Sequence, residues 1–202
     1  MKGSRKRRKA LAELYYYIAV LALFGGIVLY GKAKNSGMDE GTIKVVFILG
    51  TILVVAAIIG IGILIKHIKR KKYLNSPLGA VDQMSGEEFE RYLKAHFEKL
   101  GYRVSLTPQT NDYGADLVCK NKEETLIIQA KRYRGKVGNS AIQEIVAAMG
   151  YYKADRCMVV TNSFFTPNAI ELARANNVEL WDRKDINKKF VTNKTDSTGR
   201  NG

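Results

Sequence analysis

Two long apolar runs without charge fill much of the N-terminal third of the chain. Residues 14–30 form a 17-residue run and residues 45–65 a 21-residue run. A helix rises about 1.5 Å per residue and the hydrocarbon core of a bilayer is about 30 Å thick, so the second run can cross it easily and the first only just. The pattern therefore predicts two transmembrane helices within residues 1–74.

Basic residues flank both runs on the outer sides. Those before the first run are Lys2, Arg5, Lys6, Arg7, Arg8 and Lys9, and those after the second are Lys66, Lys69, Arg70, Lys71 and Lys72. By the positive-inside tendency, both ends face the cytoplasm, which predicts a multi-pass cell-membrane protein with lipid as a partner. Two alternatives stay open: the first run as a cleaved signal peptide, or both runs as buried helices of a soluble protein.

Beyond residue 74 the pattern becomes mixed. We expect a linker at residues 75–84, a domain at residues 85–190 and a disordered polar tail at residues 191–202. Ser85 and Glu88 form a capping-box pattern that starts a helix, and Gly101 stops it. Further helices are predicted after a cap at Asn139 or Ser140, from Thr166-Pro167 to about Ala175, and around residues 185–190.

Short β-branched and apolar runs predict five strands, at residues 102–106, 114–120, 125–132, 157–161 and 178–181. The element order is αβββαβαβ. The first three strands can pair as a meander and the later ones are separated by helices, so we predict an α/β fold with a mixed sheet and helices on both faces.

The charge and the cysteines add little to this picture. The net charge is +14, but residues 1–74 hold 14 basic and 3 acidic residues (+11), whereas residues 75–202 hold 19 and 16 (+3). The basic excess thus belongs to the N-terminal segment and is no argument for nucleic-acid binding by the domain. Cys119 and Cys157 stand singly in apolar runs, which predicts buried, reduced thiols.

A cluster of polar residues is predicted on the hairpin formed by the second and third strands. Gln129 and Lys131 share one strand face, and in the right register Asp116 joins them. Asp116 can ligate magnesium, Glu90 on the first helix can supply a second oxygen and the Ala130 carbonyl a third. Lys131 can then serve the attacking water and balance phosphate charge. The alternative is structural: Asp116 bonding backbone at a turn, and Lys131 opening a solvated basic face.

An ordered set of motifs over about residues 82–184 carries a family resemblance. Its pieces are Phe89-Glu90, Gly101-Tyr102, Asp112-Tyr113-Gly114-Ala115-Asp116, Gln129-Ala130-Lys131-Arg132-Tyr133, Val159-Val160-Thr161-Asn162, Phe165-Thr166 and Ala169. The set resembles the catalytic domain of Mrr-type restriction endonucleases, within the PD-(D/E)xK nuclease class. The resemblance implies a restriction-endonuclease-like fold, a QxK site of Asp116, Gln129 and Lys131 with Glu90, and Mg²⁺ as cofactor, replaceable by Mn²⁺.

The resemblance also implies DNA as the substrate. Gln143 resembles a polar residue that faces DNA, and Arg132, Arg134 and Lys136 supply positive charge beside the site. We therefore expect a membrane-anchored, metal-dependent DNA endonuclease acting in restriction of foreign DNA, with a homodimer as a possible form. The alternatives are a non-catalytic membrane-tethered nucleic-acid binder or adaptor, and a junction-resolving nuclease.

Overall fold

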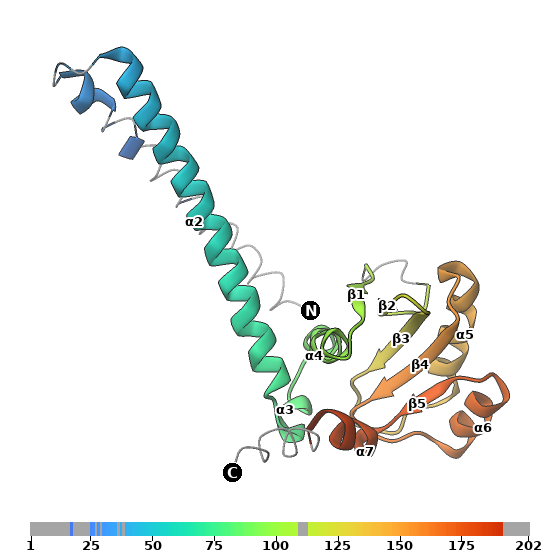
Figure 1. Ribbon diagram of the computed structural model, residues 1–202. Coiled ribbons are helices and arrows are strands. Elements are labelled where there is room, and N and C mark those ends of the chain that lie inside the picture. The colour runs from blue at the N-terminus through green and yellow to red at the C-terminus, as the bar shows by residue number, and fades with distance from the viewer. Residues whose placement is uncertain are drawn as a thin grey trace, which may run out of the picture. The chain divides into compact units, whose positions relative to one another are not determined.

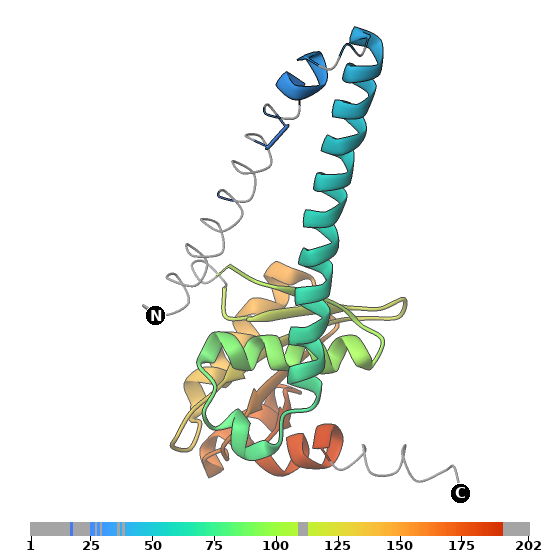
Figure 2. The ribbon, with the colours of Figure 1, turned by 90° about the vertical axis from the view of Figure 1, so that its left-hand side faces the viewer.

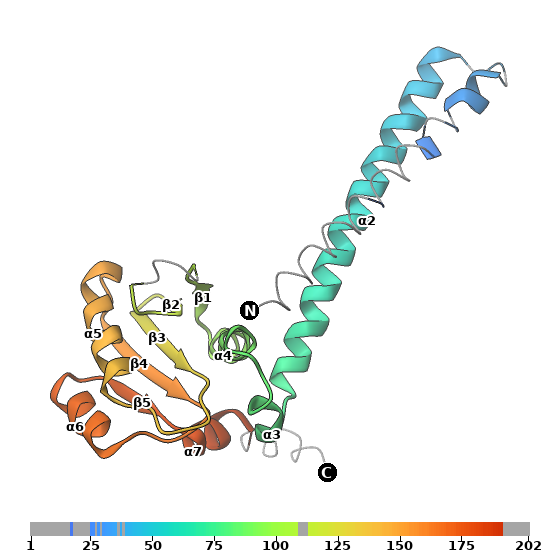
Figure 3. The ribbon, with the colours of Figure 1, turned by 180° about the vertical axis from the view of Figure 1, so that it is seen from behind.

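The computed structural model describes residues 17, 25–26, 28, 30–35, 37, 39–108 and 113–191. The chain divides into two compact units, residues 1–66 and 67–202, and each is described by itself. The three views of the ribbon show the second unit as a sheet between helical layers (Figures 1, 2 and 3).

One helix dominates the first unit. α2 runs over Glu40–Leu74 and continues past the unit boundary. Among the described residues it is the one helix long and apolar enough to cross a membrane, and none of its apolar window is buried by protein. It contains the second predicted span, residues 45–65. Most of the first predicted span, residues 14–30, lies outside the described residues.

The sheet of the second unit has five strands in the order β1-β2-β3-β4-β5. The strands are β1 Arg103–Leu106, β2 Leu117–Lys120, β3 Thr125–Lys131, β4 Arg156–Thr161 and β5 Glu179–Trp181. β1, β2 and β3 pair antiparallel as the predicted meander, whereas β3, β4 and β5 pair parallel. The predicted mixed sheet is therefore present.

Helices cover both faces of this sheet. α4 (Gly86–Lys99) covers one face, and α5 (Asn139–Tyr152) and α6 (Pro167–Ala175) cover the other (Figures 1 and 3). Alternate residues of β3 serve the two sides, because strand side chains alternate. Ile128 packs in the core beneath α4, and Ile127 packs in the core beneath α5 and α6.

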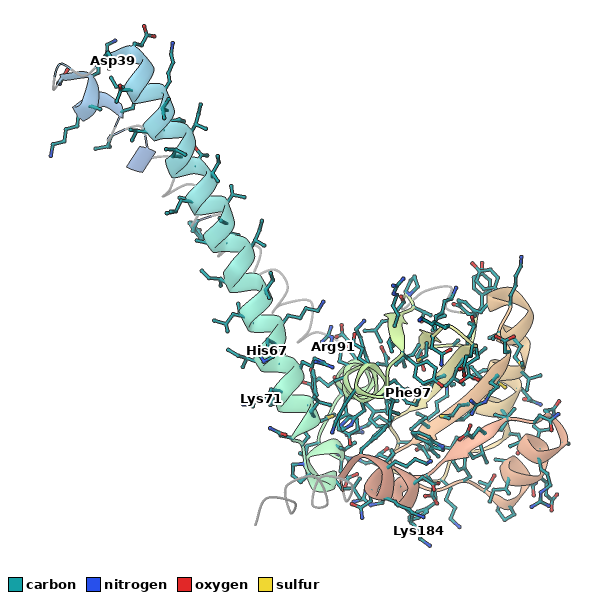
Figure 4. All side chains as sticks on the ribbon, in the orientation of Figure 1. Asp39, His67, Lys71, Arg91, Phe97 and Lys184 are labelled. Carbon is teal, nitrogen blue, oxygen red and sulfur yellow. The ribbon has the colours of Figure 1, made fainter. Side chains whose placement is uncertain are left out.

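The α4 layer contains most of the aromatic core. Phe89, Tyr92 and Phe97 are fully buried, and Phe97 stacks on Trp181 with ring centroids 5.4 Å apart. Figure 4 shows Phe97 on the sheet side of α4. His96 is also buried here and stacks on Phe190 at 4.1 Å, as expected for a packed helix residue.

Several predicted helix ends are confirmed. The Ser85 hydroxyl accepts from the Glu88 amide at 3.2 Å and the Glu88 carboxylate accepts from the Ser85 amide at 3.0 Å, which is the capping box. Gly101 follows α4 with φ +97°. Thr166 caps α6, whose first residue is Pro167. Both cysteines are free and buried.

Other expectations at element ends were wrong. Neither Asn139 nor Ser140 caps α5: both lie inside the helix, and the cap position is Gly138, which has no side chain to accept a hydrogen bond from the first turn. β2 begins at Leu117 rather than at Gly114, because Gly114 lies in a turn and residues 115–116 lie between that turn and the strand. The last helix begins before the predicted residue 185, as α7 Arg183–Ile186 with a capping box from Asp182 and Asp185. A π-helix at Asn187–Val191 follows it.

The segment expected to be a linker, residues 75–84, is part of the folded unit. It forms the short helix α3 (Leu78–Val81), and Val81 and Met84 are buried in the core beneath α4. The reason is that two apolar side chains at this spacing reach the core ahead of the capping box. The predicted tail, residues 191–202, lies outside the described residues except for Val191.

Candidate active site

Asp116 and Gln129 meet at the point where β2 and β3 leave their shared ladder. The Asp116 amide donates to the Ile128 carbonyl at 2.9 Å, which continues the hairpin register by one residue. Asp116 Oδ2 accepts from Gln129 Nε2 at 2.8 Å and from the Ala130 amide at 2.7 Å. The predicted register is therefore correct, and the carboxylate lies against the backbone of the residue that precedes Lys131.

Gln129 has a feature that a purely structural amide rarely shows. Gln129 is 5% exposed, and its Oε1 has no hydrogen-bond partner among the residues that the structure describes. Burying an amide oxygen without a partner costs roughly 1–3 kcal/mol, so such a group needs a reason. An amide oxygen is a suitable ligand for a hard divalent cation.

Asp116 and Gln129 fit a magnesium site with few protein ligands, in which water and substrate phosphate supply the rest. Among the residues that the structure describes, no three His, Cys, Asp or Glu side chains come together to hold a metal ion. Magnesium commonly keeps several waters and binds through one or two carboxylates plus substrate phosphate. A site of Asp116 Oδ and Gln129 Oε1, completed by water and phosphate, meets that requirement.

Glu90 and the Ala130 carbonyl were the other predicted ligands. Glu90 is half-buried on α4, the helix on the sheet face opposite the one that bears Gln129. For Ala130 the structure shows the amide, bound to Asp116 Oδ2. Their ligand roles therefore stay predictions.

Lys131 has an acidic partner that the sequence did not reveal. Its ammonium donates to Glu144 Oε2 at 2.6 Å, and the two side chains are 32% and 43% exposed. Glu144 lies on α5, next to Gln143, which is exposed. The α5 pattern marked its buried stripe, but not which polar residue beside that stripe reaches the end of β3.

The loop that bears Asp116 packs directly on the backbone of Glu144. Gly114 adopts φ +91°, and a Cβ placed on it would lie 2.8 Å from the Glu144 carbonyl carbon and closer still to its oxygen. Only glycine fits there. Glu144 therefore binds Lys131 through its side chain and contacts the loop that bears Asp116 through its backbone. Lys131 and the Asp116 loop are thus positioned by the same residue of α5.

A second polar network lies beyond the ends of β3 and β4. Arg183 binds Asp82 through two hydrogen bonds of 2.6 and 2.8 Å, and Asn162 donates to Asp82 Oδ1 at 2.9 Å. The Arg183 hydrogen bonds hold the pKa of the Asp82 carboxyl below its usual value, despite the opposing effect of burial. Asp82 was not predicted as a functional residue because it lies in the segment expected to be a linker.

The domain that bears this site matches a known protein family. Residues 81–190 match the Mrr_cat family, described as "Restriction endonuclease". The chain belongs to this family. The matched residues comprise the whole sheet and both helical layers, so they form a restriction endonuclease domain with a nuclease fold.

The individual proteins that this chain resembles share less than 30% sequence identity with it. The uncharacterized protein y4cE of Sinorhizobium fredii (strain NBRC 101917 / NGR234) is 29% identical over 98 residues, 46% of this chain, and the match spans 25% of that protein. Among solved structures, AF1548, a protein of unknown function, is 16% identical with a TM-score of 0.45, over 55% of this chain and 65% of that one.

Two of the similar structures are those of restriction endonucleases. AspBHI, a DNA modification-dependent restriction endonuclease, is 18% identical with a TM-score of 0.44, over 58% of this chain and 34% of that one. MspJI, in complex with a 27-mer oligonucleotide, is 18% identical with a TM-score of 0.37, over 48% of this chain and 25% of that one. The match thus covers about a third of the length of AspBHI and a quarter of that of MspJI.

The predicted DNA-binding residues of the Mrr_cat domain divide into two groups. Arg134, Lys136 and Gln143 are exposed. Arg132 is half-buried and donates to the Asp82 carbonyl at 2.9 Å, which ties it to the segment before α4. The exposed residues are therefore the better candidates for phosphate contacts.

Proposed function

We propose that the chain is a membrane-anchored, divalent-metal-dependent DNA endonuclease that takes part in restriction of foreign DNA. The observation that carries the proposal is the set of Asp116, Gln129 and Lys131 inside a Mrr_cat domain, with the buried Gln129 Oε1 unpaired within the described part of the chain. A cluster with a purely structural role would gain no stability from leaving that oxygen unpaired.

Each residue has a definable part in phosphodiester hydrolysis. Asp116 and the Gln129 amide oxygen would hold the cation, and a bound divalent cation would supply positive charge that polarises the phosphate. Glu90, on the helix that covers the other face of the sheet, stays a predicted further oxygen donor. Lys131 donates hydrogen bonds to the attacking water and to a phosphate oxygen. Glu144 holds the Lys131 ammonium in place before DNA binds. Because the ion pair is partly exposed to solvent, it can separate when DNA binds.

The full chain in detergent micelles should cut plasmid and linear DNA when Mg²⁺ or Mn²⁺ is present and stop when EDTA is added. Cleavage is followed on gels, with junction and plain duplex substrates side by side. The matched control is Asp116→Asn, which keeps the shape of the side chain but loses the charge that holds the cation. If the wild type and this variant give the same background, with or without EDTA, the non-catalytic adaptor is the correct interpretation.

The membrane part of the proposal rests on α2. Its central apolar surface is exposed over several turns, for example at Ile52, Leu53 and Ile59, and water disfavours a surface of that size. Lys71 in its last turns belongs to the basic segment expected at the cytoplasmic surface (Figure 4).

Membranes from cells that make the full chain should retain it after washing with alkaline carbonate, because carbonate strips proteins held only by charge. The chain is detected in pellet and supernatant by immunoblot. A protein that binds lipid solely through its basic segment would be released into the supernatant, and that result would refute the membrane-spanning role of α2.

A further inference from the structure

A cleft lies directly beyond the candidate active site. It has a volume of about 430 Å³ and is lined by Asp82, Gln83, Tyr133, Arg134, Asn162, Ser163, Phe164 and Arg183. That volume is in the range of roughly 300–1,000 Å³ typical of small-molecule sites. Nothing in the QxK chemistry requires it.

The walls of the cleft are tied together by hydrogen bonds. The loop after β3 pairs with the loop after β4: the Val137 amide donates to the Phe164 carbonyl at 2.9 Å, and the Thr166 amide donates to the Val137 carbonyl at 3.0 Å. The Tyr133 amide donates to Asn162 Oδ1 at 2.7 Å. The cleft is therefore a preformed feature of the fold.

Its floor is already saturated with polar contacts. Asp82 is bound by Arg183 and Asn162, and the Arg183 guanidinium also donates to the Asn162 carbonyl at 3.1 Å. Because the Asp82 charge is matched by Arg183, the floor does not repel an anionic ligand strongly.

The remaining lining groups form a set that suits one ligand class. Tyr133 and Phe164 are 58% and 40% exposed, which is high for rings beside a rigid polar floor. One side of the Tyr133 ring is backed by Gly135, where an added Cβ would lie 3.2 Å from a ring carbon. Gln83 and Ser163 offer an amide and a hydroxyl, and the exposed Arg134 offers a guanidinium. Such rings can stack on a base, an amide and a hydroxyl can bind the edge of the base, and a guanidinium can bind its phosphate.

The cleft also lies at the right distance from the chemistry. Tyr133 follows Lys131 by two residues, so their Cα atoms are at most about 7 Å apart. Thr161 Oγ1 donates to the Lys131 carbonyl at 2.7 Å, which brings the beginning of the Asn162–Phe164 wall to the same edge. A nucleotide one or two positions from the cut phosphate would reach it.

We propose that this cleft binds an unpaired nucleotide next to the scissile phosphate, so that the preferred substrate is DNA with single-stranded character at the cut. The inference builds on the proposed nuclease function. Bases in a duplex are stacked on each other and present only their edges in the grooves, so they cannot use the rings of Tyr133 and Phe164.

The test is binding of a fluorescein-labelled single-stranded oligodeoxynucleotide to the full chain in detergent, in EDTA so that no cleavage occurs, with the matching duplex measured alongside. Tyr133→Ala and Phe164→Ala should each weaken binding of the single strand roughly tenfold. Duplex binding, which depends on phosphate contacts, should change little. Phe164→Leu keeps the apolar bulk without the ring and should behave like Phe164→Ala.

Tyr151→Ala is the matched control, since Tyr151 is 61% exposed on α5 and stacks on Tyr113 outside the cleft. It should leave single-strand binding unchanged. The proposal is overturned if the wild type does not bind the single strand, if the cleft variants bind it like the wild type, or if they lose duplex binding equally. Because binding is measured without metal, a chain that fails to cut DNA can still pass this test, and an active nuclease can fail it.

Discussion

Lys131→Ala should lower the rate of metal-dependent DNA cleavage by roughly 100-fold or more, the effect expected when a group that serves proton transfer or transition-state charge is removed. The physical reason is that Lys131 is the cation placed beside Asp116 and Gln129 by the register of β3. Its side chain is about a third exposed, so truncating it should leave the fold intact. The measurement is the single-turnover cleavage rate at saturating enzyme.

Two companion variants separate the Lys131 role from loss of charge in general. Lys120→Ala removes an exposed cation from the same hairpin and should weaken DNA binding slightly, in a salt-dependent way, without a large change in the single-turnover rate. Glu144→Gln keeps a side chain of the same shape beside Lys131 but removes the charge, and its loss should be smaller than that of Lys131→Ala. A Lys131→Ala enzyme that cuts at the wild-type rate would exclude Lys131 from the chemistry.

Strand periodicity in the sequence predicted how the residues of the candidate site are arranged on the hairpin. Asp116, Gln129 and Lys131 could be found because side chains alternate on a strand and a short hairpin restricts the possible registers. The capping residues Ser85 and Thr166 were equally predictable, since their chemistry is local. Each of these inferences needs only neighbours a few residues away.

The missed residues depend on long-range packing. Glu144 contacts Lys131 only because α5 packs on the sheet with this residue next to the end of β3. Asp82 contacts Arg183, which lies 101 positions later in the chain. Neither contact leaves a local pattern. Gly114 carried a signal that was available in the sequence, a glycine two residues before a candidate ligand, but the atom that requires glycine there belongs to Glu144.

Gly114→Ala should destabilise the domain by roughly 2–5 kcal/mol and abolish DNA cleavage. Two costs add: strain of an L-residue at φ +91°, about 1–2 kcal/mol, and a clash with the rigid backbone of α5, about 1–3 kcal/mol. The loop can avoid the clash only by moving away from Glu144, which displaces Asp116 from Gln129. Trp181, the one tryptophan of the chain, lies in the core and reports unfolding by its fluorescence in a denaturant titration.

Gly101→Ala is the matched control for the strain alone. Gly101 has φ +97°, nearly the same as Gly114, but an added Cβ there would meet nothing within 4 Å. It should therefore cost about 1–2 kcal/mol and leave cleavage intact. The difference between the two variants measures the contact of Gly114 with Glu144. If both variants unfold at the same denaturant concentration and cut DNA equally well, the Asp116 loop does not depend on its contact with α5, and the geometry of the site must be held by the β2–β3 ladder alone.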